Sequence, residues 1–105
     1  MTTMSQHVVT EVSATVAPDR EDDLVAGFRQ LLRSSTPDGL LRTELLRGQE
    51  GHWRIQTLWR DRASLDAMRA ASEPPAAPTL FRRVGAEPSL TVLDVAADHL
   101  AGSDV

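Results

Sequence analysis

The chain has 105 residues, of which 41% are hydrophobic and 25% charged, a composition typical of one globular domain and a length too short for two. A formal net charge of −4 argues against nucleic acid as a partner, because binding to phosphates leaves a basic footprint. The sequence has no cysteine, no secretory leader and no apolar run near the roughly 20 residues of a membrane span, so we expect a cytoplasmic protein without disulfides or membrane contact.

The first predicted element is a strand over residues 8–16, because apolar and polar side chains alternate there. The apolar side of this strand carries Val8, Val12, Ala14 and Val16. A helix is predicted over residues 20–34, since apolar side chains recur there at the spacing of one helix face. This stripe consists of Leu24, Val25, Phe28, Leu31 and Leu32. Residues 34–39 are rich in Ser, Pro, Asp and Gly, which predicts a turn.

The second half of the chain predicts a hairpin, two helices and a last strand. Strands over residues 40–47 and 52–60 flank a short connection whose two glycines can adopt positive φ angles. Asp61 can cap a helix that carries Leu65 and Met68 and ends before Pro74. Pro78 can occupy the first turn of a further short helix, which carries Leu80, Phe81 and Val84 and stops at Gly85. Residues 90–96 form the last predicted strand.

This order of elements predicts an α+β fold of ferredoxin-like βαββαβ type, with a four-stranded antiparallel sheet and helices on one face. The opposite face of the sheet is expected to carry both polar and apolar side chains. Its charged and polar side chains are those of Arg42, Glu44, Arg54 and Gln56, and its apolar side chains are those of Val9, Leu40, Leu46 and Leu58. A second copy of the chain would cover this face, which predicts a homodimer. We expect a single domain over residues 1–105, ordered over about 7–96, with residues 1–6 and 98–105 flexible.

A candidate binding site lies on the strand over residues 52–60. Alternation places Trp53, Ile55, Thr57 and Trp59 on one face, where two indoles and a hydroxyl would form a wall for a flat aromatic ligand. Thr10 is expected near Thr57, with Thr43 as a further candidate. The alternative is that both tryptophans are core packing and that the threonines serve strand formation.

Charged residues that could act on a substrate are few. Arg82 or Arg83, on the short helix, could stabilise a developing anion, and His52 could accept a proton. The alternative, which the residue types favour, is that the arginines and His52 are solvated surface residues. The three histidines have no ligand spacing, so no metal site is expected.

The segment over residues 55–68 resembles the strand-to-helix segment of the antibiotic biosynthesis monooxygenase family, in which a tryptophan closes a strand before an acidic cap and an apolar helix. The resemblance extends over residues 8–95 and implies a homodimeric ferredoxin-like α/β barrel with a pocket between sheet and helices. It also implies oxidation of an aromatic polyketide, such as an anthrone, to a quinone by O2 without metal or flavin. Trp59 matches the family's strand-ending tryptophan. Ile55, Leu65 and Met68 depart from an asparagine, a tyrosine and a histidine of family members.

These observations lead to three hypotheses. The first is a monooxygenase that needs no cofactor, has Trp59, Arg82 and His52 as catalytic residues, and takes an aromatic substrate and O2. Its expected substrate-binding residues are Thr10, Phe28, Trp53, Ile55, Thr57, Leu65, Met68 and Phe81. The second is a polyketide cyclase on the same fold, and the third is a protein that binds an aromatic ligand without turnover. Haem degradation is rejected, because the chain has no asparagine and has Met68 where haem-degrading relatives have a histidine.

Overall fold

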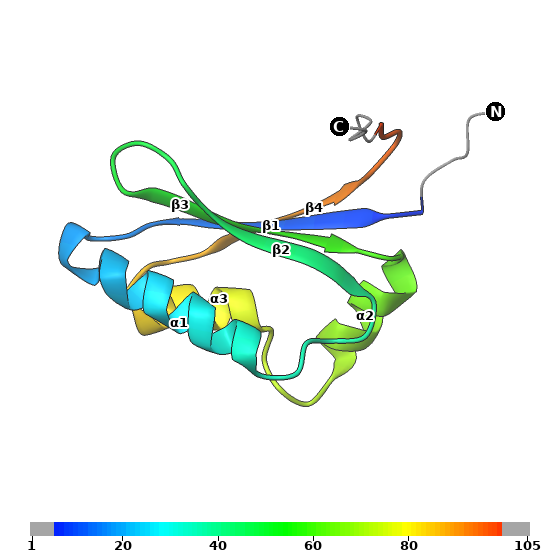
Figure 1. The fold of residues 1–105 in the computed structure, drawn as a ribbon, viewed down its shortest axis with the longest axis horizontal. Coiled ribbons are helices and arrows are strands. Elements are labelled where there is room, and N and C mark those ends of the chain that lie inside the picture. The colour runs from blue at the N-terminus through cyan, green and yellow to red at the C-terminus, as the bar shows by residue number, and fades with distance from the viewer. Residues whose placement is uncertain (1–5, 100–105) are drawn as a thin grey trace, which may run out of the picture.

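The computed structural model describes residues 6–99, in which strands and helices follow the order that the sequence predicts (Figure 1). The elements are strand β1 (Val8–Thr15), the short 3-10 helix η1 (Pro18–Arg20), helix α1 (Glu21–Arg33), strand β2 (Leu40–Arg47), strand β3 (His52–Trp59), helix α2 (Arg62–Ala70), helix α3 (Ala76–Arg83) and strand β4 (Ser89–Asp94). The flexibility expected of the termini concerns residues 1–5 and 100–105, which lie outside the described residues, together with Gln6, Asp98 and His99.

Local sequence signals account for where the helices begin and end. The carboxylate of Asp61 accepts a hydrogen bond from the backbone N–H of Ser64 at 2.8 Å, so Asp61 caps α2 as predicted. Pro78 lies in the first turn of α3, where its missing N–H costs no helix bond. Gly85 follows α3 with φ +77°, a conformation that favours glycine and ends the helix.

The four strands form one sheet in the order β2-β3-β1-β4, and every neighbouring pair is antiparallel. The helices α1, α2 and α3 all lie on the same face of this sheet (Figure 1). The predicted ferredoxin-like α+β fold is therefore confirmed. In the pairing of β1 with β3, Thr10 lies opposite Thr57, and Val12 lies opposite Ile55. Both pairs point toward the helices, because all four residues are buried.

Two clusters of buried side chains join the sheet to the helices. The larger cluster includes Val12, Leu24, Phe28, Trp53, Ile55, Leu80 and Phe81. The smaller cluster consists of Val8, Trp59 and Leu65, with Leu40, Met68 and Val92 packed against it. The two clusters lie toward opposite ends of β3, and side chains from both of them line a cavity described below.

The expectation that Leu40 lies on the open face of the sheet is wrong. The register of β2 against β3 shifts between Leu40 and Arg42, so Leu41 is an extra residue in the strand. Leu40 consequently lies opposite Trp59 and packs on the helix side with the smaller cluster, whereas the side chain of Leu41 is exposed. Strict alternation from residue 42 could not reveal the inserted residue.

The face of the sheet opposite the helices carries an apolar row and two ion pairs. Val9 lies opposite both Leu58 and Leu93 in the sheet, so these three side chains form a row across β3, β1 and β4. Arg54 lies 3.5 Å from Glu11 on the neighbouring strand, and the Arg42 guanidinium donates to Glu44 at 2.8 Å. No helix of the described residues 6–99 covers this face (Figure 1). Within the same residues, no helix has the length and the apolar character needed to span a membrane.

Candidate functional site

A cavity of about 500 Å³ lies between the sheet and the three α-helices. Its walls come from all four strands, from the inward faces of α1 and α2, and from the start of α3. Side chains in these walls include Thr10, Phe28, Thr43, Ile55, Thr57, Trp59, Leu65 and Met68. The loop over residues 34–37 and the segment over residues 73–78 also line it. The volume lies within the range that small-molecule sites occupy, and the lining is mainly apolar with a few hydroxyls.

Three threonines form a row across the sheet at the wall of the cavity. Thr57 of β3 lies opposite Thr10 of β1 on one side and opposite Thr43 of β2 on the other. The hydroxyls of Thr43 and Thr57 share a hydrogen bond at 2.9 Å. The indole Nε1–H of Trp59 donates to the hydroxyl of Thr10 at 3.1 Å. This threonine row, Thr10, Thr57 and Thr43, supplies polar atoms to an otherwise apolar wall.

The interior of the cavity is neutral. The charged side chains among its described lining residues are those of Arg69 and Glu73, which are both exposed. Within residues 6–99, no group of three or more histidine, aspartate or glutamate side chains is arranged to hold a metal ion. A ligand would therefore meet aromatic and aliphatic surface with hydroxyl donors at the sheet. Such a site is suited to a flat aromatic molecule that carries oxygen on one edge.

The structure brings most of the predicted site residues together. Seven of them line the cavity, namely Thr10, Phe28, Ile55, Thr57, Trp59, Leu65 and Met68. Four other predicted site residues, all within the described part of the chain, lie outside its lining: His52, Trp53, Phe81 and Arg82.

The expectation of a wall made by both tryptophans is wrong. Trp53 and Trp59 share a face of β3, but they are six positions apart, which corresponds to about 20 Å along the strand. Trp53 is buried in the larger core cluster, where its Nε1–H donates to Glu21 at the start of α1 at 2.8 Å. The guanidinium of Arg47 lies 5.0 Å from the centre of the Trp53 ring. Trp53 therefore joins α1 to the sheet, and Trp59 alone contributes an indole to the cavity.

The placement of His52, Phe81 and Arg82 also corrects the expected site. His52 begins β3 with the parity of the open sheet face, is exposed, and lies 3.3 Å from the hydroxyl of Thr15. Phe81 is fully buried within the larger core cluster. Arg82 is exposed in the last turn of α3. Since none of these three side chains lines the cavity, none is placed to act on a ligand there.

Sequence reasoning missed the residues at the rim of the cavity. The loop that follows α1 and the proline-rich segment that precedes α3 contribute Thr36, Pro37, Pro74 and Pro75 to the lining. The signal for these segments was the density of proline and serine, which predicts loops but not which surface they close. Their position depends on how α1 and α3 pack, which is not a local property.

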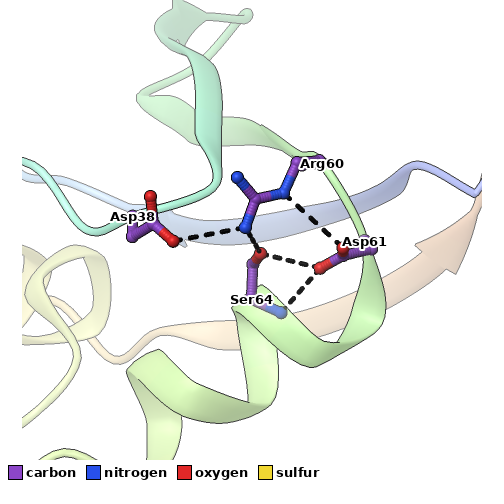
Figure 2. A network of polar contacts seen from close by, with 4 residues as sticks. All are labelled: Asp38, Arg60, Asp61 and Ser64. Carbon is purple, nitrogen blue, oxygen red and sulfur yellow. Dashed lines mark hydrogen bonds and ion pairs between the residues drawn. The ribbon is translucent and has the colours of Figure 1, made fainter.

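A polar network fixes the end of the first of these loops (Figure 2). The guanidinium of Arg60 donates to Asp38 at 3.2 Å and to the hydroxyl of Ser64 at 3.1 Å. Ser64 in turn donates from its hydroxyl to Asp61 at 2.7 Å. The backbone N–H of Arg60 also donates to the carbonyl of Gly39 at 2.7 Å. The loop is thereby tied to the first turn of α2, beside the cavity.

The network shifts the pKa of two of its members. Hydrogen bonds from the hydroxyl and the backbone N–H of Ser64, together with the charge of Arg60, lower the pKa of the Asp61 carboxyl. The hydrogen bond and charge of Asp38, followed by the charge of Asp61, raise the pKa of the Arg60 guanidinium. Both groups are therefore held in their charged forms at neutral pH.

Comparison with known proteins gives the chain a context. The sequence profile described as "Antibiotic biosynthesis monooxygenase" matches residues 7–76. A search of curated protein sequences finds no match. Among solved structures, SnoaB, a cofactor-independent oxygenase from Streptomyces nogalater, is similar with a TM-score of 0.62 and 21% identity, over 93% of this chain and 100% of that one. Rv0793 from Mycobacterium tuberculosis is similar with a TM-score of 0.63 and 22% identity, over 91% and 99% of the two chains. A conserved protein from Methanosarcina mazei Go1 is similar with a TM-score of 0.67 and 14% identity, over 85% and 92%.

Proposed function

Because the chain belongs to the antibiotic biosynthesis monooxygenase family, we propose that it is a cofactor-independent monooxygenase that oxidises an aromatic polyketide of anthrone type to a quinone with O2. In this reaction the ring methylene loses two hydrogens and gains one oxygen atom as a carbonyl, and the second oxygen atom leaves as water. The observation that carries the proposal is the neutral cavity lined by Trp59, Phe28 and the threonine row. The similar fold of a cofactor-independent oxygenase supports it.

The cavity suits the demands of this chemistry. A cofactor-free oxygenase must bind its substrate as an electron-rich anion and keep that anion away from water while O2 accepts an electron from it. An anthrone is acidic enough to supply much of the driving force through its own ionisation. The apolar walls around Phe28 and Leu65 would exclude water, and hydroxyl donors at the sheet would stabilise the oxygen on which negative charge develops.

The direct test is incubation of the pure, metal-free protein with an anthrone under O2, with quinone followed by absorbance and O2 by an electrode. We expect quinone formation above the buffer rate, with one O2 consumed per quinone, and no quinone in the absence of O2. Trp59→Phe should lower the rate, because Trp59 lines the cavity. Trp53→Phe is the matched control, since this second tryptophan of β3 lies outside the cavity. A rate equal to that of buffer would refute the proposal.

The neutral interior also favours a second candidate, a protein that binds an aromatic ligand and does not turn it over. The charged side chains in the described lining are the exposed Arg69 and Glu73, so a buried general base is lacking among the residues that line the cavity. This candidate predicts saturable binding of a polycyclic aromatic with quenching of the Trp59 fluorescence, and no consumption of O2.

We further propose that the chain acts as a homodimer joined through the open face of the sheet. The row formed by Val9, Leu58 and Leu93 offers apolar surface that a second copy would bury, at about 25 cal/mol per Å². Sedimentation at micromolar concentration should give the mass of two chains, and Val9→Glu should give the mass of one. A wild-type chain that sediments as a stable monomer would refute this pairing.

A further inference from the structure

We infer that the hydroxyl of Thr10, oriented by the indole of Trp59, is the donor that anchors an oxygen atom of an aromatic ligand in the cavity, with a second donor from the Thr43–Thr57 pair. The ligand class is a polycyclic aromatic that carries two oxygen acceptors, carbonyl or phenolate, on one edge. The inference rests on the proposed function only in taking this cavity as the ligand site.

The threonine row holds more hydrogen-bond donors than the neighbouring protein groups accept. The row and the indole together hold four hydrogen-bonding hydrogens, one on each hydroxyl and one on Nε1 of Trp59. The Nε1–H of Trp59 is used by Thr10, whose oxygen accepts it at 3.1 Å. One further hydrogen lies between the oxygens of Thr43 and Thr57. Two hydrogens are left over, the one on Thr10 and the one on whichever of Thr43 and Thr57 accepts. Among residues 6–99, neither has an acceptor on the protein.

The positions of these two donors define what they can bind. Thr10 and Thr57 are 7% and 6% exposed, so their hydroxyls lie at the inner wall of the cavity and not at its rim. When Thr43 donates to Thr57, the two free donors are the hydroxyls of Thr10 and Thr57. These two residues lie directly opposite each other, and opposed side chains of antiparallel strands have Cβ atoms about 5 Å apart. They can reach two oxygen atoms on one edge of a ring system, while the apolar walls contact the rest of it. A hydrocarbon of the same shape would leave both donors without partners.

The role of Trp59 in this arrangement is that of a positioning residue. Its indole N–H is already bonded to Thr10, so it acts on the ligand through the threonine and not directly. An oxygen that accepts one hydrogen bond becomes a stronger donor for the next, so the indole also strengthens the O–H of Thr10. Loss of the N–H alone should therefore weaken recognition of the ligand's oxygen without weakening the fit of its rings.

Binding of two matched probes tests the inference without turnover. The probes are 1,8-dihydroxyanthraquinone, which carries oxygens along one edge, and anthracene, which has the same three rings and no oxygen. The variants are Thr10→Val, Thr10→Ser, Trp59→Phe and the double variant Thr10→Val/Trp59→Phe. Affinities are measured by equilibrium dialysis, and thermal melting checks that each variant is folded.

We expect the wild type to bind the quinone at least about tenfold more tightly than anthracene, since a net hydrogen bond corresponds to roughly five- to tenfold in affinity. Thr10→Val should lose about five- to tenfold for the quinone and nothing for anthracene, and Thr10→Ser should restore the loss. Trp59→Phe removes ring surface as well as the N–H, so both probes should lose affinity, and the quinone should lose about two- to threefold more than anthracene. The quinone-to-anthracene ratio of the double variant should match that of Thr10→Val, which would show that the loss does not come from an indole N–H left without an acceptor.

The inference is overturned if the wild type shows no preference for the quinone. It is also overturned if Thr10→Val keeps the wild-type preference, whether its affinities are unchanged or fall equally for both probes. Because anthraquinones are not oxidised further here, these outcomes are independent of the anthrone assay. Quinone selectivity without anthrone turnover would refute the oxygenase and leave the anchor intact. Anthrone turnover, together with a Thr10→Val variant that keeps the wild-type preference for the quinone, would support the oxygenase and refute the anchor.

Discussion

The replacement Trp59→Ala removes an indole that packs between β3 and α2 and also borders the cavity. Trp59 is 3% exposed and packs with Val8 and Leu65 in the smaller core cluster. A tryptophan side chain buries about 150–250 Å², which at about 25 cal/mol per Å² corresponds to roughly 4–6 kcal/mol. Alanine retains part of this contact, and buried tryptophan-to-alanine changes cost about 3–5 kcal/mol. Since one side of the ring already borders the cavity, we expect a loss of about 3 kcal/mol.

The assay is thermal and urea unfolding at a fixed protein concentration, because association of chains would couple stability to concentration. For a domain near 100 residues, about 3 kcal/mol lowers the melting temperature by roughly 12–24 °C. The control is Trp53→Ala, in which the indole is enclosed in the larger cluster and also donates to Glu21, so its loss should be larger. A Trp59→Ala protein that melts within a few degrees of wild type would refute the burial of this ring.

Two further predictions concern the network beside the cavity. Gly39→Ala should destabilise the fold more than Gly85→Ala. Both glycines have φ near +80°, so an alanine at either position costs about 1–2 kcal/mol in backbone strain. At Gly39 the added Cβ would also overlap the side chain of Ser64, whereas at Gly85 it would meet no atom. Equal losses in urea unfolding would contradict this crowding. Because Ser64 lowers the pKa of Asp61 below its ordinary value of 3.8, the carboxylate stabilises the fold above that pH and loses its effect as the pH falls through the lowered pKa. The stability difference between wild type and Asp61→Ala should therefore shrink below pH 3.8, and a difference that stays constant down to about pH 2 would contradict it.

The positions of the elements followed closely from the sequence. Alternation over residues 8–16 and 52–60 identified β1 and β3, and Asp61 and Pro78 marked where α2 and α3 begin. Alternation also assigned Thr10, Ile55, Thr57 and Trp59 to the face of the sheet that borders the cavity. These features depend on residues within a few positions of each other, so the pattern of a short segment is sufficient to predict them.

Alternation could not, however, predict which side chains of that face lie close together in the folded chain. Trp53 and Trp59 share a face, but only the distance along β3 places one in the core and the other at the cavity. The third hydroxyl of the cavity wall is that of Thr43, which lies opposite Thr57. This placement depends on the register of β2 against β3, which alternation does not reveal. That register includes the extra residue Leu41, for which the sequence carries no signal.

The order of the elements, and the sheet face of most strand residues, can be predicted from the sequence, because side-chain period and capping are set by neighbouring residues. Three features become visible only in the folded chain: the hydrogen bond between Trp59 and the threonine row, the closure of the cavity by two loops, and the contacts of Arg60 that tie one of these loops to α2. These contacts join residues up to 49 positions apart in the chain. Their geometry depends on strand register and helix packing, which form only when distant segments meet.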